Sequence, residues 1–549
     1  MKLGRQAGLW VPASLVLLSV TAVTAGGPKP AVSAASDERH VEVLASDDFG
    51  GRKPGQPGEP KTLDYLQAEF KRLGLKPAVN GSYLQEVPMI EITANSDTAL
   101  TIKSAANTRT LAYRTDMVIW TKRVVPSIDV KDSPLVFVGY GVVAPEYQWN
   151  DYAGINMKGK TAVILVNDPG WDGDDPNLFK GLAMTYYGRW VYKYEEAMRQ
   201  GAVAALIVHE ERPAAYPWDT VIASNAGSKL DVDPPDGNLG RVALEGWITH
   251  EAAAQLLADA GQSYDELKKA ASRRGFKAVP LAATVSGGVN NAIRRGKSAN
   301  VIGYLPGRKR PREYVVYGAH WDHLGQAFGR SGDLITNGAE DNATGTAGML
   351  AIAEAFARGR RPERSVVFVG ITLEESGLLG SAWYAANPVF PLAQTVANIN
   401  IDVLHFGPRT HDVIVLGSGA SELDDYIADA ARLQGRYLAP DPTPEKGTFY
   451  RSDHFNFAKA GVPAMLINHG IDELVGGKAA GQARRSEYVA VRYHKPSDEY
   501  RPGVDLSGGA EDLQLLYAVG QKLANERSWP NWRPGNEFRA TRDRSRAIH

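Results

Sequence analysis

Residues 314–323 read Tyr314-Val-Val-Tyr-Gly-Ala-His-Trp-Asp-His323, an apolar run that ends in residues able to bind metal. The apolar part is rich in β-branched and aromatic residues, which predicts a strand buried on both faces. Similar runs recur along the chain, with helix-like segments such as 343–357 and 421–434 between them. This alternation predicts an α/β fold, a mostly parallel mixed sheet sandwiched by helices. The expected strands are 300–304, 314–318, 365–371, 397–401, 413–416 and 464–467.

Composition limits the classes of function that the chain can have. It has 549 residues, 44% of them hydrophobic and 22% charged, which is enough to build several domains. Lysine and arginine total 61 and aspartate and glutamate total 62, so the formal net charge is −1. This balance gives no general attraction to nucleic acid, which we do not expect as a partner. The chain has no cysteine, so catalysis must rest on other side chains or on a bound metal.

The first 25 residues have the pattern of a signal peptide. Lys2 and Arg5 precede an apolar run from Leu9 to Val23, and small residues that suit signal peptidase follow at 23–25. The run is shorter than the ~20 residues of a membrane span, although an uncleaved anchor or a buried helix is the alternative. We therefore expect a periplasmic or secreted protein with no stable membrane span in its mature form.

Five residues of the types that bind zinc lie where the predicted strands or their loops end: His320, Asp341, Glu375, Asp402 and His494. Each alone is a weak signal, because an aspartate after a strand often caps a helix and adjacent glutamates usually lie on a solvated face. Together they lie at the carboxyl ends of strands, where parallel sheets carry their functional loops. They predict a site for two metal ions, which can share one carboxylate and one water at a separation of about 3.5–4 Å.

Two further carboxylates suit the chemistry of such a site. A ligand imidazole usually donates its second ring N–H to a carboxylate, and Asp322 lies two residues after His320. Glu374 and Glu375 are successive residues, so their side chains diverge as the chain leaves its strand. One of them can bind metal while the other acts as general base toward the water that bridges the metals.

These motifs resemble the co-catalytic two-zinc aminopeptidases, which include bacterial leucyl aminopeptidases, glutamate carboxypeptidase II and the catalytically inactive transferrin receptor. The resemblance rests on His320-Trp-Asp322, 338–345, 374–381, Asn400-Ile-Asp402 and His494. It implies two Zn²⁺ per chain, one held by His320, Asp341 and Asp402, the other by Asp341, Glu375 and His494. Mn or Co would also suit these ligands.

The same resemblance assigns roles to the remaining residues. It implies that Glu374 is the general acid and base and that Asp322 orients His320. In the family a tyrosine before a Ser-Asp-His segment stabilises the oxyanion, and Tyr450 precedes such a segment here, with Phe449 as the alternative.

Domain boundaries follow from the same motifs. The family resemblance covers 37–130 and 296–525, which we expect to form the catalytic domain in two segments. Residues 131–290 resemble an inserted, β-rich protease-associated domain, through 137–141, 159–166 and 197–202. The expected C-terminal tail, 526–549, has a basic end at 539–546 that we expect to be frayed and solvated.

The predicted function is a dinuclear zinc exopeptidase acting on peptide substrates, and foremost an aminopeptidase that releases N-terminal residues. One alternative is a carboxypeptidase or dipeptidase with the same two-metal site. Another is a glutaminyl cyclase with a single zinc, and a third is a non-catalytic binding protein. The presence of all five ligands and Glu374 argues against the last of these.

Overall fold

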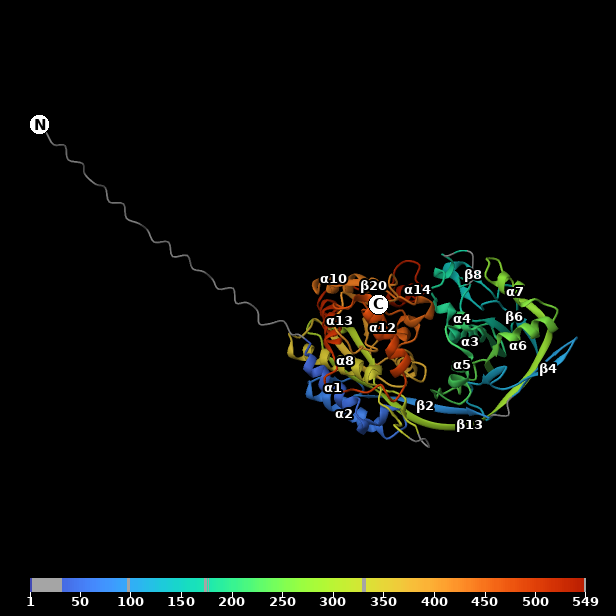
Figure 1. Ribbon diagram of the computed structural model, residues 1–549, viewed down its shortest axis with the longest axis horizontal. Coiled ribbons are helices and arrows are strands. Elements are labelled where there is room, and N and C mark those ends of the chain that lie inside the picture. Colours follow the sequence, from blue (N-terminus) through green and yellow to red (C-terminus); the bar gives the residue numbers. More distant parts are fainter. Residues whose placement is uncertain (2–31, 96–98, 172–174, 176, 328–331, 548–549) are drawn as a thin grey trace.

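The computed structural model describes residues 1, 32–95, 99–171, 175, 177–327 and 332–547 (Figure 1). The predicted signal peptide, residues 1–25, lies outside this described part apart from Met1. Within the described residues, no helix combines the length and the apolar character needed to cross a bilayer.

The first sheet contains the six strands expected from the apolar runs. Its central strands β17, β14, β18 and β21 are parallel to one another, whereas β13 and β2 pair antiparallel at one side and β19 at the other. The α/β fold class is therefore as expected. In spatial order the strands are β11 (Ser228–Val232), β2 (Leu84–Ala94), β13 (Val279–Leu305), β17 (Arg364–Ile371), β14 (Arg310–His320), β18 (Thr395–Asn400), β21 (Ala464–His469), β19 (Asp412–Leu416) and β20 (Tyr437–Pro440), and the short β1 (Lys76–Pro77) also pairs with β13.

Helices cover both faces of this sheet, because successive side chains of a strand point to opposite faces. Val315 packs in the cluster that contains α2, α8, α10 and α13, whereas Val316 packs in the cluster that contains α9 and α11. The helices of the first face are α2 (Gly58–Arg72), α8 (Thr344–Arg358), α10 (Leu423–Leu433) and α13 (Ser507–Asn525), and those of the second are α9 (Leu379–Ala386) and α11 (His454–Lys459). Further helices are α1 (Ala34–Leu44), which packs on α8, and α12 (Gly477–Glu487).

A second sheet forms a separate module, on the right of Figure 1. The 27-residue strand β13 runs through both sheets, and its first half pairs with β3 and β6 of the second. The order is β5 (Met117–Trp120), β12 (Leu244–Thr249), β10 (Ala204–His209), β9 (Thr161–Leu165), β6 (Ser127–Phe137), β13, β3 (Leu100–Ser104) and β4 (Thr108–Leu111). Its helices are α3 (Trp190–Arg199), α4 (Glu211–Ala214), α5 (Trp218–Asn225), α6 (His250–Asp259) and α7 (Tyr264–Ala271).

Strands β3, β4 and β5 come from the segment 37–130, which we expected to belong with the first sheet. They pair instead in the second sheet, where β3 pairs with β13, β4 pairs with β3 and β5 pairs with β12. Two small two-stranded sheets complete the fold: β7 (Val143–Ala144) with β8 (Trp149–Asn150), and β15 (Gly325–Gln326) with β16 (Ile335–Thr336).

The two modules contact each other through an aromatic cluster and an ion pair. The Tyr186 ring of the second module lies 5.2 Å from the Phe455 ring of α11, and Glu195 of α3 accepts a hydrogen bond from Lys459 Nζ at 2.9 Å. The backbone N–H of Met184 donates to the carbonyl of Pro444. These contacts hold the second module against the loop that precedes α11.

The expectation of a frayed basic end is wrong. Residues Arg539–Ala547 form helix α14, and Arg542 is buried. Its guanidinium donates to the carbonyl oxygens of Thr395 at 2.9 Å and Leu392 at 3.4 Å. Arg542, one of the arginines that suggested a solvated tail, therefore attaches α14 to the start of β18.

Candidate metal centre

The structure brings the five predicted ligand residues together at one point. His320 Nε2 lies 3.3 Å from Asp341 Oδ1 and 3.1 Å from Asp402 Oδ1. His494 Nε2 lies 3.2 Å from Asp341 Oδ2 and 3.2 Å from Glu375 Oε2. Asp341 thus faces a different histidine with each of its oxygens, the arrangement expected of a carboxylate that bridges two metal positions.

Strand register explains why residues distant in the sequence meet here. In the parallel pairs, His320 of β14 aligns with Ile371 of β17, and Gly318 aligns with Asn400 of β18. All three strands end at the same edge, so His320, Glu375 and Asp402 leave the sheet side by side.

Asp341 is positioned by a hydrogen-bonded loop at the start of α8. The carboxylate of Asp498 accepts the backbone N–H groups of Glu340 at 3.1 Å and Asp341 at 3.2 Å. On the other side, the Asn342 side-chain oxygen accepts the backbone N–H of Val403, which follows Asp402. The peptide bond between Asp341 and Asn342 is cis. The Asn342 side chain thus links the segment that carries Asp341 to the segment that carries Asp402.

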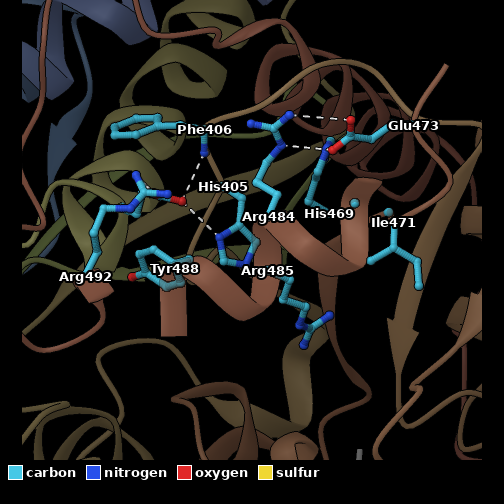
Figure 2. Close-up of a pocket in the computed structure, with 12 residues that line it drawn as sticks. His405, Phe406, His469, Ile471, Glu473, Arg484, Arg485, Tyr488 and Arg492 are labelled. Carbon is cyan, nitrogen blue, oxygen red and sulfur yellow. Dashed lines mark hydrogen bonds and ion pairs between the residues drawn. The ribbon is translucent and has the colours of Figure 1, made fainter. Parts of the chain in front are cut away.

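The side chain of Glu340 fixes the same loop from its far side, through contacts with Arg492, His405 and Phe406, which are labelled in Figure 2. One carboxylate oxygen pairs with Arg492 at 2.7 Å, and the other accepts from the His405 ring at 2.9 Å and the Phe406 N–H at 3.1 Å. Arg492 and His405 line a pocket beside α12, together with Phe406, His469, Gly470, Ile471, Glu473, Gly481, Arg484, Arg485 and Tyr488. The pocket borders the metal-facing loop, since Asp341 follows Glu340 directly.

Arg52 supports the site, and the sequence analysis did not select it. Its buried guanidinium donates to the carbonyls of Trp321 at 2.9 Å, Asn337 at 2.6 Å and Gly338 at 2.8 Å, and also to that of Leu44. Burial lowers the pKa of Arg52 to about 10, although nearby carboxylates favour its charge. The sequence signal for Arg52 was a charged residue inside the glycine-rich turn 50–55. Charged residues in such turns are commonly exposed, so Arg52 did not stand out.

The carboxylate of Asp322 contacts a different partner from the one expected. Its Oδ1 accepts the Glu374 N–H at 3.0 Å and its Oδ2 the Glu375 N–H at 3.4 Å. His320 Nδ1 lies 3.1 Å from the main-chain oxygen of Asp322 and 3.9 Å from Oδ1. The carbonyl therefore orients the imidazole, because the carboxylate is occupied by the turn that presents the two glutamates.

Asp402 is held by Ser452, another residue that the sequence analysis did not select. The Ser452 hydroxyl donates to Asp402 Oδ2, and it accepts from Asn400 Nδ2 at 2.7 Å. Ser452 and Asn400 are both buried. The contact leaves Asp402 Oδ1 directed at His320.

Glu374 has the electrostatic environment of a proton-transfer group. Burial raises the pKa of its carboxyl well above the ordinary value, and the nearby charges of Asp402 and Glu375 raise it further, while His320 opposes them. For His320, burial by itself lowers the pKa, but Asp402 and Glu374 outweigh it and raise the value well above normal. Both residues face a concentration of negative charge that a cation would neutralise.

The structure does not bring Tyr450 into the cluster. Its hydroxyl donates to Glu537 Oε1 at 3.1 Å, and its ring packs against Phe449 with centroids 5.2 Å apart. Tyr493 lies closer: its ring stacks on His494 at 3.9 Å between centroids. Partial desolvation raises the pKa of Tyr493, although 41% of the residue is exposed, and the charge of Asp341 adds to the effect. Tyr493 is therefore a tyrosine that lies beside the cluster. Its place directly before His494 is the sequence feature that could have identified it.

The residues present fit divalent metal ions. The donors are imidazole nitrogens and carboxylate oxygens, the set that Zn²⁺ accepts, and two groups that share Asp341 have ligand atoms within 4.8 Å of one another. The groups are His320, Asp341 and Asp402, and His323, Asp341 and Glu375. Glu375 Oε1 and both ring nitrogens of His323 are buried without a hydrogen-bond partner. Buried polar atoms of this kind need a partner, and a cation supplies one.

The chain is similar to several known proteins. Residues 300–508, which include all five predicted ligands, match Peptidase family M28. The chain is 28% identical over 238 residues to the probable glutamate carboxypeptidase LAMP1 of Arabidopsis thaliana, a match that covers 42% of this chain and 28% of that protein. It is 33% identical over 137 residues to the aminopeptidase NAALADL1 of Mus musculus, covering 24% of this chain and 17% of the relative. The matched segments thus span less than a third of either relative.

The fold is similar to that of a solved aminopeptidase from Aneurinibacillus sp. strain AM-1. The two chains are 20% identical, with a TM-score of 0.50 over 91% of this chain and 95% of the other. Residues 300–508 therefore match the model of Peptidase family M28, and the chain has an α/β fold similar to that of this aminopeptidase.

Proposed function

We propose that this protein is a zinc-dependent exopeptidase with two metal ions, and foremost an aminopeptidase. One observation carries the proposal: five nitrogen and oxygen donors from three strand ends and two loops converge, with Asp341 facing a histidine through each oxygen. In this assignment His320, Asp341 and Asp402 hold one Zn²⁺, and Asp341, Glu375 and His494 hold the other. Two donor groups that share one aspartate favour two ions over the single zinc of a cyclase.

Zinc would supply Lewis-acid chemistry, polarising the scissile carbonyl and making water a stronger nucleophile near neutral pH. Glu374 does the proton transfer, because its carboxyl lies beside the cluster and is not one of the assigned ligands. It takes the proton of the attacking water and delivers it to the leaving amine. Asp322 keeps Glu374 in place through the backbone N–H of that residue.

Carboxypeptidase or dipeptidase activity on the same site is the second candidate. It is favoured by the Arabidopsis relative, which is described as a probable glutamate carboxypeptidase, whereas the mouse relative is described as an aminopeptidase. Peptides of one sequence with a free or an acetylated N-terminus separate the two activities. An aminopeptidase cleaves only the free form, and equal turnover of both would contradict our first choice.

The general base is tested by Glu374→Gln, which keeps the size of the side chain and removes its proton-accepting oxygen. We expect kcat to fall by about 10² to 10⁴-fold, the usual contribution of general acid–base catalysis. Glu363→Gln is the matched control, because Glu363 lies at the amino end of β17, opposite the site, and pairs with surface cations. Unchanged hydrolysis in Glu374→Gln would reject this role.

Two features of organisation belong to the proposal as well. We propose that the chain is exported, on the basis of residues 1–25, and that 131–290 form a protease-associated domain. The first is tested by the N-terminal sequence of the mature protein, with cleavage near residue 25 as the expected result. The second is tested by limited proteolysis, with a protected fragment that contains 131–290 and extends through β3 and β13 as the expected result.

A further inference from the structure

His323 is a sixth candidate donor at the metal centre, outside the five predicted ligands. Its side chain is completely buried, and its Nδ1 lies 2.6 Å from Glu375 Oε1. The His323 and His494 rings meet edge to face, with centroids 5.7 Å apart. One ligand atom from each of His323, Asp341 and Glu375 falls within 4.8 Å of the others, which is close enough to surround one ion.

The 2.6 Å contact between His323 Nδ1 and Glu375 Oε1 is an ion pair without the angles of a well-formed hydrogen bond. Neither ring nitrogen of His323, nor Glu375 Oε1, has a hydrogen-bond partner with acceptable geometry, and all three atoms are buried. An unpaired buried donor or acceptor costs about 1–3 kcal/mol, so three of them beside one another need an explanation. A cation beside both atoms would satisfy them, since ligand atoms of one ion lie about 3 Å apart without a hydrogen between them.

The backbone opposite His323 is shaped to admit the ring. Gly338 has φ +58°, and a Cβ at this position would lie 2.4 Å from His323 Cδ2. No larger residue fits there without displacing the imidazole or the loop that carries Asp341. Gly338 is itself fixed, because its carbonyl accepts from Arg52 at 2.8 Å. The imidazole is therefore held in place from two sides by main chain and by Glu375.

We propose that His323 is an additional ligand of the ion held by Asp341, Glu375 and His494. This inference rests on the proposed function, because it presumes the two-metal site. The two ions then differ: one has a single imidazole, and the other has two. We expect the ion with two imidazoles to bind more tightly and to be the last that a chelator removes.

The test compares the wild-type protein with His323→Asn, in which the amide nitrogen keeps a donor near the position of Nδ1 but is a poor metal ligand. X-ray absorption at the zinc edge counts imidazoles, and titration of zinc into the metal-free protein measures affinity. We expect three imidazoles shared by two zinc ions in the wild type and two in the variant. The affinity of the tighter ion should fall by more than about tenfold.

His469→Asn is the matched control, because His469 is also a buried histidine that pairs with a carboxylate, Asp512, at 2.7 Å. It should keep three imidazoles and unchanged zinc affinity. Circular dichroism of each metal-free variant shows that the fold is retained, and His323→Gln provides a second replacement if Asn unfolds the protein. Equal imidazole counts and affinities in wild type and His323→Asn would overturn the role of His323 alone. A wild type that binds no zinc would instead overturn the proposed function, and this inference with it.

Discussion

Replacing Arg52 with lysine tests whether a side chain far from the ligands in sequence holds the metal-binding loops together. The guanidinium donates to four carbonyl oxygens, those of Leu44, Trp321, Asn337 and Gly338. A lysine ammonium is a single point of donation and cannot reach all four, so at least two buried carbonyls lose their partner. At about 1–3 kcal/mol for each unpaired group, the free energy of unfolding should fall by roughly 2–6 kcal/mol.

The assay is thermal unfolding of the zinc-loaded protein, followed by zinc titration of the metal-free form. For domains of this size a loss of 1 kcal/mol lowers the midpoint by roughly 2–4 °C, so we expect a drop on the order of 10 °C. Zinc should also bind more weakly, because the freed carbonyls follow His320 and precede Asp341. Arg358→Lys is the control, since Arg358 is an exposed arginine on α8 and should shift the midpoint little. A midpoint for Arg52→Lys within a degree of the wild type would refute this reasoning.

Three further predictions concern the site and its surroundings. Ser452→Ala removes the hydroxyl that donates to Asp402, so zinc should bind about 10–100-fold more weakly in competition with a chromophoric chelator, and a change below about twofold would contradict it. Burial lowers the pKa of His454 to about 3, so its contribution to stability is complete above pH 6.5 and is lost as the pH falls toward 3. The loss of stability that urea unfolding measures between pH 7.5 and pH 4.5 should be about 2–3 kcal/mol smaller in His454→Leu than in the wild type, and an equal loss in both would exclude this group. Chelation of the metal should lower the thermal midpoint, because an ion at 100 times its Kd stabilises the folded state by about 2.7 kcal/mol, and added zinc should restore it; an unmoved midpoint would argue against a bound ion.

The fold class and the positions of the candidate ligands at the strand ends could be predicted from the residue pattern along the chain. Val315 and Val316 enter clusters on opposite faces of the first sheet, as a strand covered on both faces requires. Because parallel strands end together at one edge, the polar residues after β14, β17 and β18 could be expected to meet. Their assignment as zinc ligands stays a prediction, although the segment that carries them matches Peptidase family M28.

The side chains that support that edge could be identified only from contacts between segments that are distant in the sequence. Arg52 bonds to Gly338, 286 residues away, and Tyr450 turns from the cluster because Glu537 accepts its hydroxyl. Likewise, strand β3 joined the second sheet because one half of β13 offered it an edge. The physical reason is common to all three: hydrophobic period and residue type act over a few neighbouring positions, whereas a long-range hydrogen bond depends on the packing of distant segments.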